Sequence, residues 1–167
     1  ISPGPFREPI NTLTNLGFMV VGLYILYKIT NETSFNDFSG INKITVLYGV
    51  AVVYLGPGSM MMHGTNTEWG GWADNLSMVM YIVIPWLYNI YKMSDWTVNV
   101  FLKIYIAIVL IYALMRGLFG YGMGIGLDLF GVSIGLWVIS EFLYRFWSPK
   151  MRFISVSYTH LTLPTRS

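Results

Sequence analysis

The chain has no cysteine among its 167 residues, and only 11% of its residues are charged. Without thiols there is no disulfide framework, and thiolate metal sites and cysteine nucleophiles are excluded. The scarcity of charge argues against a soluble domain, in which about 25% of residues are charged. The formal net charge is +2 and no run of Lys or Arg is present, so nucleic-acid binding is also excluded.

Apolar residues take the place of the missing charges: 54% of the chain is hydrophobic, 17% is aromatic, and the mean hydropathy is +0.56. A helix needs roughly 20 apolar residues to cross a hydrocarbon core about 30 Å thick. The apolar segments are too long for barrel strands and lack their strict alternation. We therefore predict an all-α integral membrane bundle with five complete transmembrane helices, over residues 11–29, 44–63, 74–91, 98–115 and 127–146.

Positive charges are distributed unevenly between the two ends of the predicted spans. By the positive-inside rule, the end with more Lys and Arg faces the cytoplasm. We expect the N-terminus and the His63–Asp74 loop to lie on the opposite, non-cytoplasmic side. The cytoplasmic set is Lys28, Lys43, Lys92, Arg145, Lys150 and Arg152, against Arg7 and Arg116 on the other side.

Three reactive polar side chains interrupt the apolar pattern. Ser59 and His63 are four residues apart, so a helix places them on one face. The segment 64–73 contains two adjacent glycines and two tryptophans, which predicts a chain reversal at the membrane interface. Asp74 follows this segment, and we expect Ser59, His63 and Asp74 to converge at one rim of the bilayer.

This grouping favours hydrolytic chemistry over a purely structural role. Burying an ionisable group in a membrane costs roughly 2.5–3.5 kcal/mol, although at span ends His63 and Asp74 could simply cap helices. Imidazole is a common zinc ligand, and a carboxylate beside metal-bound water can act as a general base. Catalytic zinc normally takes three protein ligands, however, and only one is evident. A Ser-His-Asp triad is the weaker rival, because Ser59 lacks the Gly-x-Ser-x-Gly elbow.

Other polar residues have structural explanations. Glu8 and Asn11 precede the first span and offer oxygen ligands of the kind calcium favours, but capping of the first helix is the preferred account. Asn15 lies one turn into that span, which predicts an interhelical hydrogen bond. Glu141 and Arg145 are four residues apart and are predicted to pair.

Three motifs, taken together, point to a family. In chain order they are Glu8-x2-Asn11-Thr12-x-Thr14-Asn15, Gly58-Ser59-x3-His63 and Asp74-x3-Met78. They resemble the membrane hydrolase superfamily that contains the alkaline ceramidases, the adiponectin and progestin receptors and the GPI-anchor lipid-remodelling factors. The resemblance is closest to bacterial ceramidase-like proteins. Thr14 stands where that family usually has serine.

The resemblance implies a seven-helix bundle in a bacterial inner membrane, in which zinc activates water to hydrolyse the amide of a ceramide-like lipid. On this basis His63 is a zinc ligand, and Asp74 binds the water and helps to deprotonate it. Ser59 stabilises the oxyanion or orients the water. Glu8 and Asn11 belong to a calcium site.

The family's other two zinc ligands form a His-x3-His pair, which this sequence does not contain. We therefore expect residues 1–155 to be a C-terminally truncated and inactive part of the hydrolase domain. Residues 156–167 resemble a translated sequencing adapter and are predicted to be a non-native tail, with a native polar C-terminus as the alternative. Two other functions stay open: a non-catalytic receptor-like or structural membrane protein, and a hydrolase of another lipid.

Overall fold

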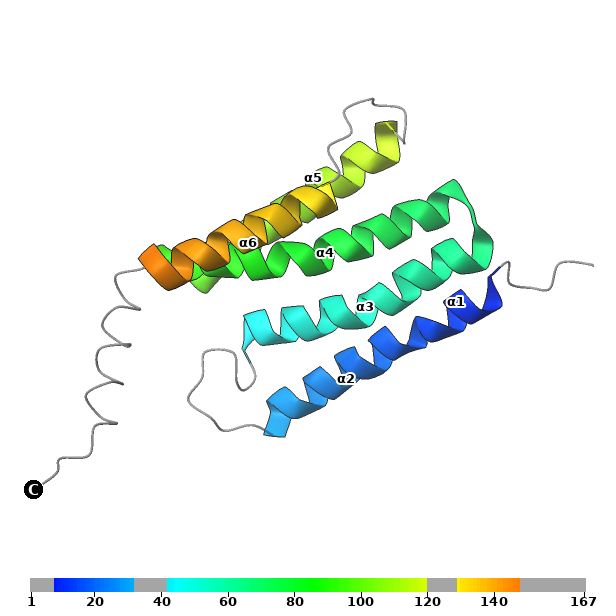
Figure 1. Cartoon of the computed structure of the whole chain (residues 1–167), viewed down its shortest axis with the longest axis horizontal. Coiled ribbons are helices and arrows are strands. Elements are labelled where there is room, and N and C mark those ends of the chain that lie inside the picture. Colours follow the sequence, from blue (N-terminus) through cyan, green and yellow to red (C-terminus); the bar gives the residue numbers. More distant parts are fainter. Residues whose placement is uncertain (1–7, 32–41, 120–128, 148–167) are drawn as a thin grey trace, which may run out of the picture.

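The protein is described here from a computed structural model, which covers residues 8–31, 42–119 and 129–147. Every regular element within these ranges is a helix, which confirms the predicted all-α class. The long helices lie side by side (Figure 1). The helices in chain order are the short α1 (Pro9–Thr14), followed by α2 (Leu16–Asn31), α3 (Lys43–Thr65), α4 (Glu68–Met93), α5 (Val98–Phe119) and α6 (Leu129–Trp147).

Four helical segments in the described ranges are long and apolar enough to cross a membrane: Pro9–Asn31, α3, α5 and α6. The predicted third span, residues 74–91, lies within α4, which is long enough but is not among the four. Asp74, Asn75 and Asn89 make α4 more polar than its neighbours. The chain is nevertheless a helical membrane bundle, as predicted.

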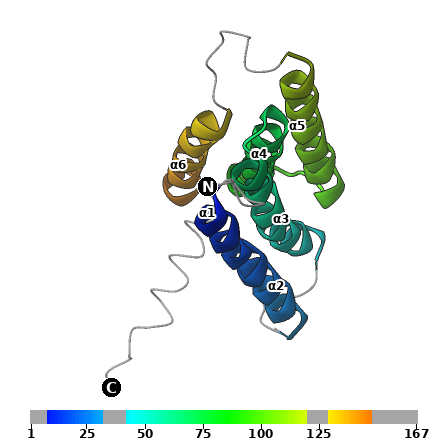
Figure 2. The ribbon, with the colours of Figure 1, turned by 90° about the vertical axis from the view of Figure 1, so that its right-hand side faces the viewer.

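The polarity of α4 is explained by its position. It contacts α3, α5 and α6, and in the turned view it lies between α5 and α6 (Figure 2). Eleven of its residues are buried, whereas only 11% of the apolar window of α5 or of α6 is buried. Helices that face lipid must be apolar, but a helix surrounded by protein can satisfy polar groups against its neighbours.

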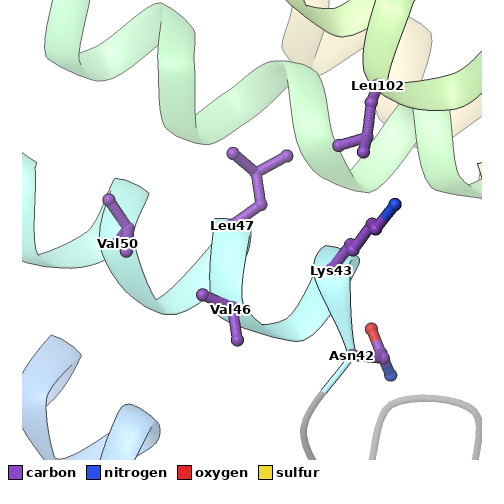
Figure 3. A pocket seen from close by; sticks show the side chains of 6 residues that line it. All are labelled: Asn42, Lys43, Val46, Leu47, Val50 and Leu102. Atoms are coloured by element: carbon purple, nitrogen blue, oxygen red, sulfur yellow. The ribbon is translucent and has the colours of Figure 1, made fainter. Parts of the chain in front are cut away.

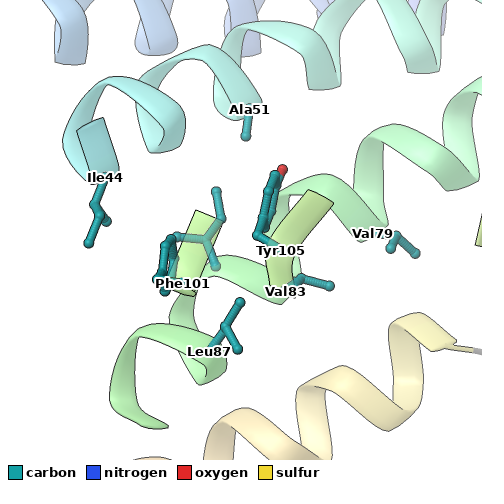
Figure 4. Close-up of a cluster of buried hydrophobic side chains, with 8 residues drawn as sticks. Ile44, Ala51, Val79, Val83, Leu87, Phe101 and Tyr105 are labelled. Atoms are coloured by element: carbon teal, nitrogen blue, oxygen red, sulfur yellow. The ribbon is translucent and has the colours of Figure 1, made fainter. Parts of the chain in front are cut away.

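The core of the bundle forms where α4 packs against α3 and α5 (Figure 4). The Tyr105 hydroxyl donates a hydrogen bond to the Met80 carbonyl at 2.9 Å, which joins α5 to α4. Close packing and such bonds hold membrane helices together, because lipid tails are as apolar as the side chains. The core residues are Ile44, Ala51, Val79, Val83, Ile84, Leu87, Phe101 and Tyr105.

The reversal between α3 and α4 is much shorter than predicted. Asn66, in the left-handed conformation with φ 49°, ends α3, and the side chain of Thr67 accepts a hydrogen bond from Gly70 N to begin α4. Two residues thus replace the predicted ten-residue loop over 64–73. Asp74 consequently lies in the second turn of α4 and not at its start.

The glycines of this segment also have a different role from the one predicted. Gly70 and Gly71 are buried inside α4 and form no bend. A Cβ at Gly70 would lie 2.6 Å from the Met61 carbonyl oxygen, so glycine allows the two helices to approach closely. A local sequence pattern cannot distinguish a glycine in a turn from one at a helix contact.

At the other end of the bundle, α4 is joined to α6 by polar contacts. The Asn89 amide donates to Ser140 Oγ and to Glu141 Oε2, each at 3.1 Å. Arg145 Nε donates to Glu141 Oε1 at 3.1 Å, which confirms the predicted pair. These residues have a structural role in the described bundle.

Candidate functional site

The start of the first helix meets the end of α3 through a carboxylate and an imidazole. Glu8 Oε2 lies 2.7 Å from His63 Nδ1, and the Glu8 backbone N–H donates to the His63 carbonyl at 3.1 Å. The Asn11 amide donates to the same Glu8 oxygen at 2.8 Å. Glu8, Asn11 and His63 therefore form one cluster, although the family resemblance assigned them to two different metals.

The pairing of Glu8 with His63 was missed by reasoning from the sequence. The available signal was topological: the chain crosses the membrane twice between the two residues, and an even number of crossings returns it to the surface from which it started. Glu8 precedes the first span and His63 ends the second, so both belong to the same membrane surface. A carboxylate and an imidazole confined to one end of adjacent helices are candidates to pair.

The hydrogen bonds at Glu8 determine the protonation of the cluster. The Asn11 side chain, and then His63, hold the pKa of the Glu8 carboxyl below its ordinary value of 4.5. Glu8 is therefore ionised at neutral pH and can only accept hydrogen bonds, so His63 Nδ1 carries a proton. In the neutral imidazole this leaves the Nε2 lone pair available. His63 keeps 33% of its side chain exposed, so a cation or a substrate can reach it.

Ser59 is held by the first helix, one turn before His63. The Asn15 amide donates to Ser59 Oγ at 3.0 Å and to the Asn11 carbonyl at 2.9 Å. This confirms the predicted interhelical bond of Asn15, which is only 7% exposed. Because Ser59 Oγ accepts this bond, its own hydroxyl hydrogen can donate to another group.

Asp74 enters the site through the close packing of α3 on α4. A Cβ at Gly58 would lie 2.5 Å from Ser77 Oγ and 3.0 Å from the Ala73 carbonyl oxygen. Ser59 and Asp74 follow Gly58 and Ala73 in the chain, so they lie at the same level of the helix pair. The Asp74 carbonyl accepts a hydrogen bond from Ser77 Oγ at 2.7 Å.

The Asp74 carboxylate is half-buried and forms no hydrogen bond or ion pair with any residue in the described ranges. Both of its oxygens can therefore accept a proton or a hydrogen bond. No hydrogen bond joins Asp74 to Ser59 or His63 within those ranges. The structure thus links Glu8 to His63 and Asn15 to Ser59, and within the described residues it leaves the Asp74 carboxylate without a partner at the level of Ser59.

The described residues do not complete a metal site. Nowhere in residues 8–31, 42–119 and 129–147 do three His, Cys, Asp or Glu side chains gather closely enough to hold a metal ion. Catalytic zinc takes about three protein ligands, and His63 is the one imidazole in these ranges. Calcium takes about 6–8 oxygen ligands, whereas the Glu8 carboxylate is already engaged by Asn11 and His63.

Fold and site together define a class: a helical membrane protein with a carboxylate-imidazole pair, a hydroxyl and a second carboxylate near one end of the bundle. The family model described as Ceramidase matches residues 6–164. The chain belongs to the ceramidase family, as its motifs predicted. This membership supports, in general terms, a membrane enzyme that hydrolyses ceramide. Comparisons with curated proteins and with solved structures find no match.

The matched range passes residue 155, the predicted end of the hydrolase domain. Residues 148–167 lie outside the described part of the structure. The predicted boundary and the nature of the segment 156–167 therefore stay predictions.

Proposed function

We propose that the active form of this protein is a zinc-dependent amidase that hydrolyses ceramide-like lipids. The observation that carries the proposal is the Glu8–His63 pair, which presents an imidazole near the end of a membrane span with Nε2 available. The amide of a ceramide lies between its hydrocarbon chains and its polar head. A site at the end of the spans is therefore at the depth where that amide lies in the bilayer.

In this proposal His63 would be one ligand of the zinc, through its available Nε2. Bound zinc would act as a Lewis acid and lower the pKa of its water. Glu8 holds the proton on Nδ1 and fixes the orientation of the ring, as carboxylates commonly do for metal-binding histidines. Two further imidazoles are required, and the described residues do not supply them. We accordingly expect residues 1–167 alone to be inactive and a longer form of the protein to be the active one.

The other two residues act on the water and the substrate. The unbonded Asp74 carboxylate accepts a proton from the attacking water. The Ser59 hydroxyl, which accepts from Asn15, donates its hydrogen to the oxygen of the lipid amide as negative charge develops there. No Ser59–His63 hydrogen bond forms in the described structure, where Ser59 is bonded to Asn15 instead. This weakens the rival Ser-His-Asp triad.

The decisive test compares His63→Ala with Met61→Ala in the longest available form of the protein. Met61 is an exposed residue of the same helix turn, so it controls for helix perturbation. We expect His63→Ala to lose bound zinc and ceramide hydrolysis together, and Met61→Ala to keep both. Zinc-dependent hydrolysis by His63→Ala would overturn the assignment.

A non-catalytic membrane protein of the same fold is the alternative function. It predicts no stoichiometric zinc in the wild-type protein. Asp74→Asn would then change stability without a matching change in hydrolysis. A hydrolase of another lipid would instead retain zinc and cleave a phospholipid ester in the same assay.

Calcium at Glu8 and Asn11 is a separate proposal. A calcium ion there would compete with the Asn11 amide hydrogens for the Glu8 carboxylate. Added calcium should then raise the unfolding temperature of the wild-type protein but not of Glu8→Gln. Equal behaviour of the two proteins would reject the calcium site.

We also propose that the site faces the non-cytoplasmic side of a bacterial inner membrane. Glu8 and His63 share one end of the bundle, while Lys28, Lys43 and Lys92 lie at the other. The chain has no cysteine, so single cysteines can report the topology without background. Thr67→Cys should react with a membrane-impermeant maleimide on intact spheroplasts, and Asp95→Cys should react only after lysis. The reverse pattern would invert the orientation.

A further inference from the structure

A groove between α3 and α5 lies far from the candidate site. It has a volume of about 530 Å³ and is lined mainly by aliphatic side chains. Figure 3 shows Leu47 and Lys43 of α3 reaching toward Leu102 of α5. Small-molecule sites typically occupy about 300–1,000 Å³, so the groove is large enough for part of a lipid. Its lining residues are Asn42, Lys43, Val46, Leu47, Val50 and Leu102.

The groove is apolar along its length and polar at one end. Val46 and Val50 lie on successive turns of α3, while Asn42 and Lys43 are at the start of that helix. From Lys43 to Val50 the helix rises about 10 Å. A hydrocarbon chain lying along α3 would thus follow the valines and leave its polar head beside Lys43.

A second hollow of about 210 Å³ continues the groove at its polar end. It shares Asn42 and Lys43 with the groove and adds Lys92, together with Tyr88 and Tyr91 of α4. Tyrosine is typical of the membrane interface, where its hydroxyl reaches the headgroups. Two lysines from different helices therefore flank one interfacial hollow.

Two lysines among the described residues at this end of the bundle favour an anion. Lys43 is exposed and donates to Asn99 Oδ1 at 3.4 Å, a long contact that a phosphate could replace. The Lys92 ammonium lies 6.0 Å from the Tyr88 ring centroid. Within the described residues, Asp95 follows Lys92 by three positions, in the turn between α4 and α5, and Glu141 is paired with Arg145.

We propose that this groove binds an anionic glycerophospholipid, with one acyl chain along Val46 and Val50 and the phosphate between Lys43 and Lys92. Lys43 is 20 residues before His63 on α3, or about 30 Å along the helix. The lipid site is thus at the opposite membrane surface from the candidate hydrolytic site, and its occupancy does not depend on the hydrolase proposal. A phosphatidylcholine would fill the same groove but would carry no net charge for the lysines.

The test is native mass spectrometry of the detergent-purified chain after equilibration with equimolar phosphatidylglycerol and phosphatidylcholine. A lysine near an anionic lipid favours binding roughly fivefold, so we expect wild-type protein to retain phosphatidylglycerol at least about fivefold over phosphatidylcholine. In Lys43→Gln/Lys92→Gln the ratio should fall to about one, with bound phosphatidylcholine unchanged. Val46→Trp, which fills the groove, should reduce binding of both lipids.

Lys103→Gln is the matched control, because Lys103 is an exposed lysine of α5 that lines neither hollow. It should keep the wild-type lipid ratio, and circular dichroism should show unchanged helix content in every variant. A wild-type ratio near one, or an equal loss in Lys103→Gln, would overturn the proposal. Glycerol phosphate binding as tightly as the lipid would also overturn it, because the site would then recognise only the anion.

Discussion

Gly58 is the position at which the packing of α3 on α4 is most directly testable. A Cβ there would lie 2.5 Å from Ser77 Oγ, 2.6 Å from Ser77 Cβ and 3.0 Å from the Ala73 carbonyl oxygen. Comfortable contacts between carbon atoms are about 3.5–4.0 Å. Rotation of Ser77 could move its Oγ, but neither its Cβ nor the Ala73 carbonyl can move without a shift of α4. Gly58→Ala must therefore separate the two helices.

The expected cost follows from two opposing contributions. Overpacking a close contact costs about 1–3 kcal/mol, and the upper half of that range applies because backbone atoms are involved. Alanine in place of glycine inside a helix recovers about 1 kcal/mol. We expect a net loss of about 1–2 kcal/mol, or roughly a 5- to 30-fold lower ratio of folded to unfolded protein. The same separation would move Ser59 relative to Asp74, so in the longer form proposed above to be active, hydrolysis should fall as well.

Reversible unfolding in mixed micelles, followed by circular dichroism, would measure the loss. Gly135→Ala is the matched control, because a Cβ at Gly135 would meet nothing within 4 Å. That variant should be unchanged or more stable by up to about 1 kcal/mol. Adding Ser77→Gly should recover part of the loss in Gly58→Ala, because it removes the Oγ and Cβ contacts together. If Gly58→Ala were as stable as Gly135→Ala, the close approach of α3 and α4 would be refuted.

Three further predictions concern hydrogen bonds that hold the helices together. The lowered pKa of Glu8 means that its ionised form stabilises the fold above its ordinary value of 4.5, and that this contribution is lost as pH falls through the lowered pKa. Glu8→Gln should therefore flatten the dependence of the unfolding midpoint on pH below 4.5, and an unchanged slope there would exclude Glu8 as its source. A double-mutant cycle of Asn15→Ala and Ser59→Ala should give a coupling of about 0.6–1.7 kcal/mol, whereas additive losses would mean that the bond is absent. Tyr105→Phe leaves the Met80 carbonyl without its donor and should cost about 1 kcal/mol in the same unfolding assay, and no measurable cost would argue against this bond.

The helices themselves were predictable because a bilayer permits few structures. Apolar runs of about 20 residues must form helices, since lipid offers no partners for backbone N–H and C=O groups. The predicted spans 44–63 and 98–115 lie inside α3 and α5, with ends displaced by a few residues. The third span was harder to judge from hydropathy, because α4 is central and its neighbours tolerate polar residues that lipid would not.

The candidate site was predictable only in part. Spacing of four residues placed Ser59 and His63 one turn apart on a helix, and the depth of Asn15 in its span indicated an interhelical bond, which the structure confirms. The pairing of Glu8 with His63 depends on the lateral order and depth of two helices, which spacing along the chain does not encode. For the same reason, capping was the expected role of Glu8, yet its side chain caps no backbone group of α1 and binds His63 instead.

The sequence by itself therefore determined the class of the protein, the positions of its helices and the motifs that identify its family, because these depend on local composition and spacing. Tertiary structure decided the two-residue turn between α3 and α4, the place of Asp74 in the second turn of α4, and the assignment of the Glu8 carboxylate to His63. Each of these depends on how closely two helices approach. That distance is set by contacts such as the one at Gly58, between residues far apart in the chain.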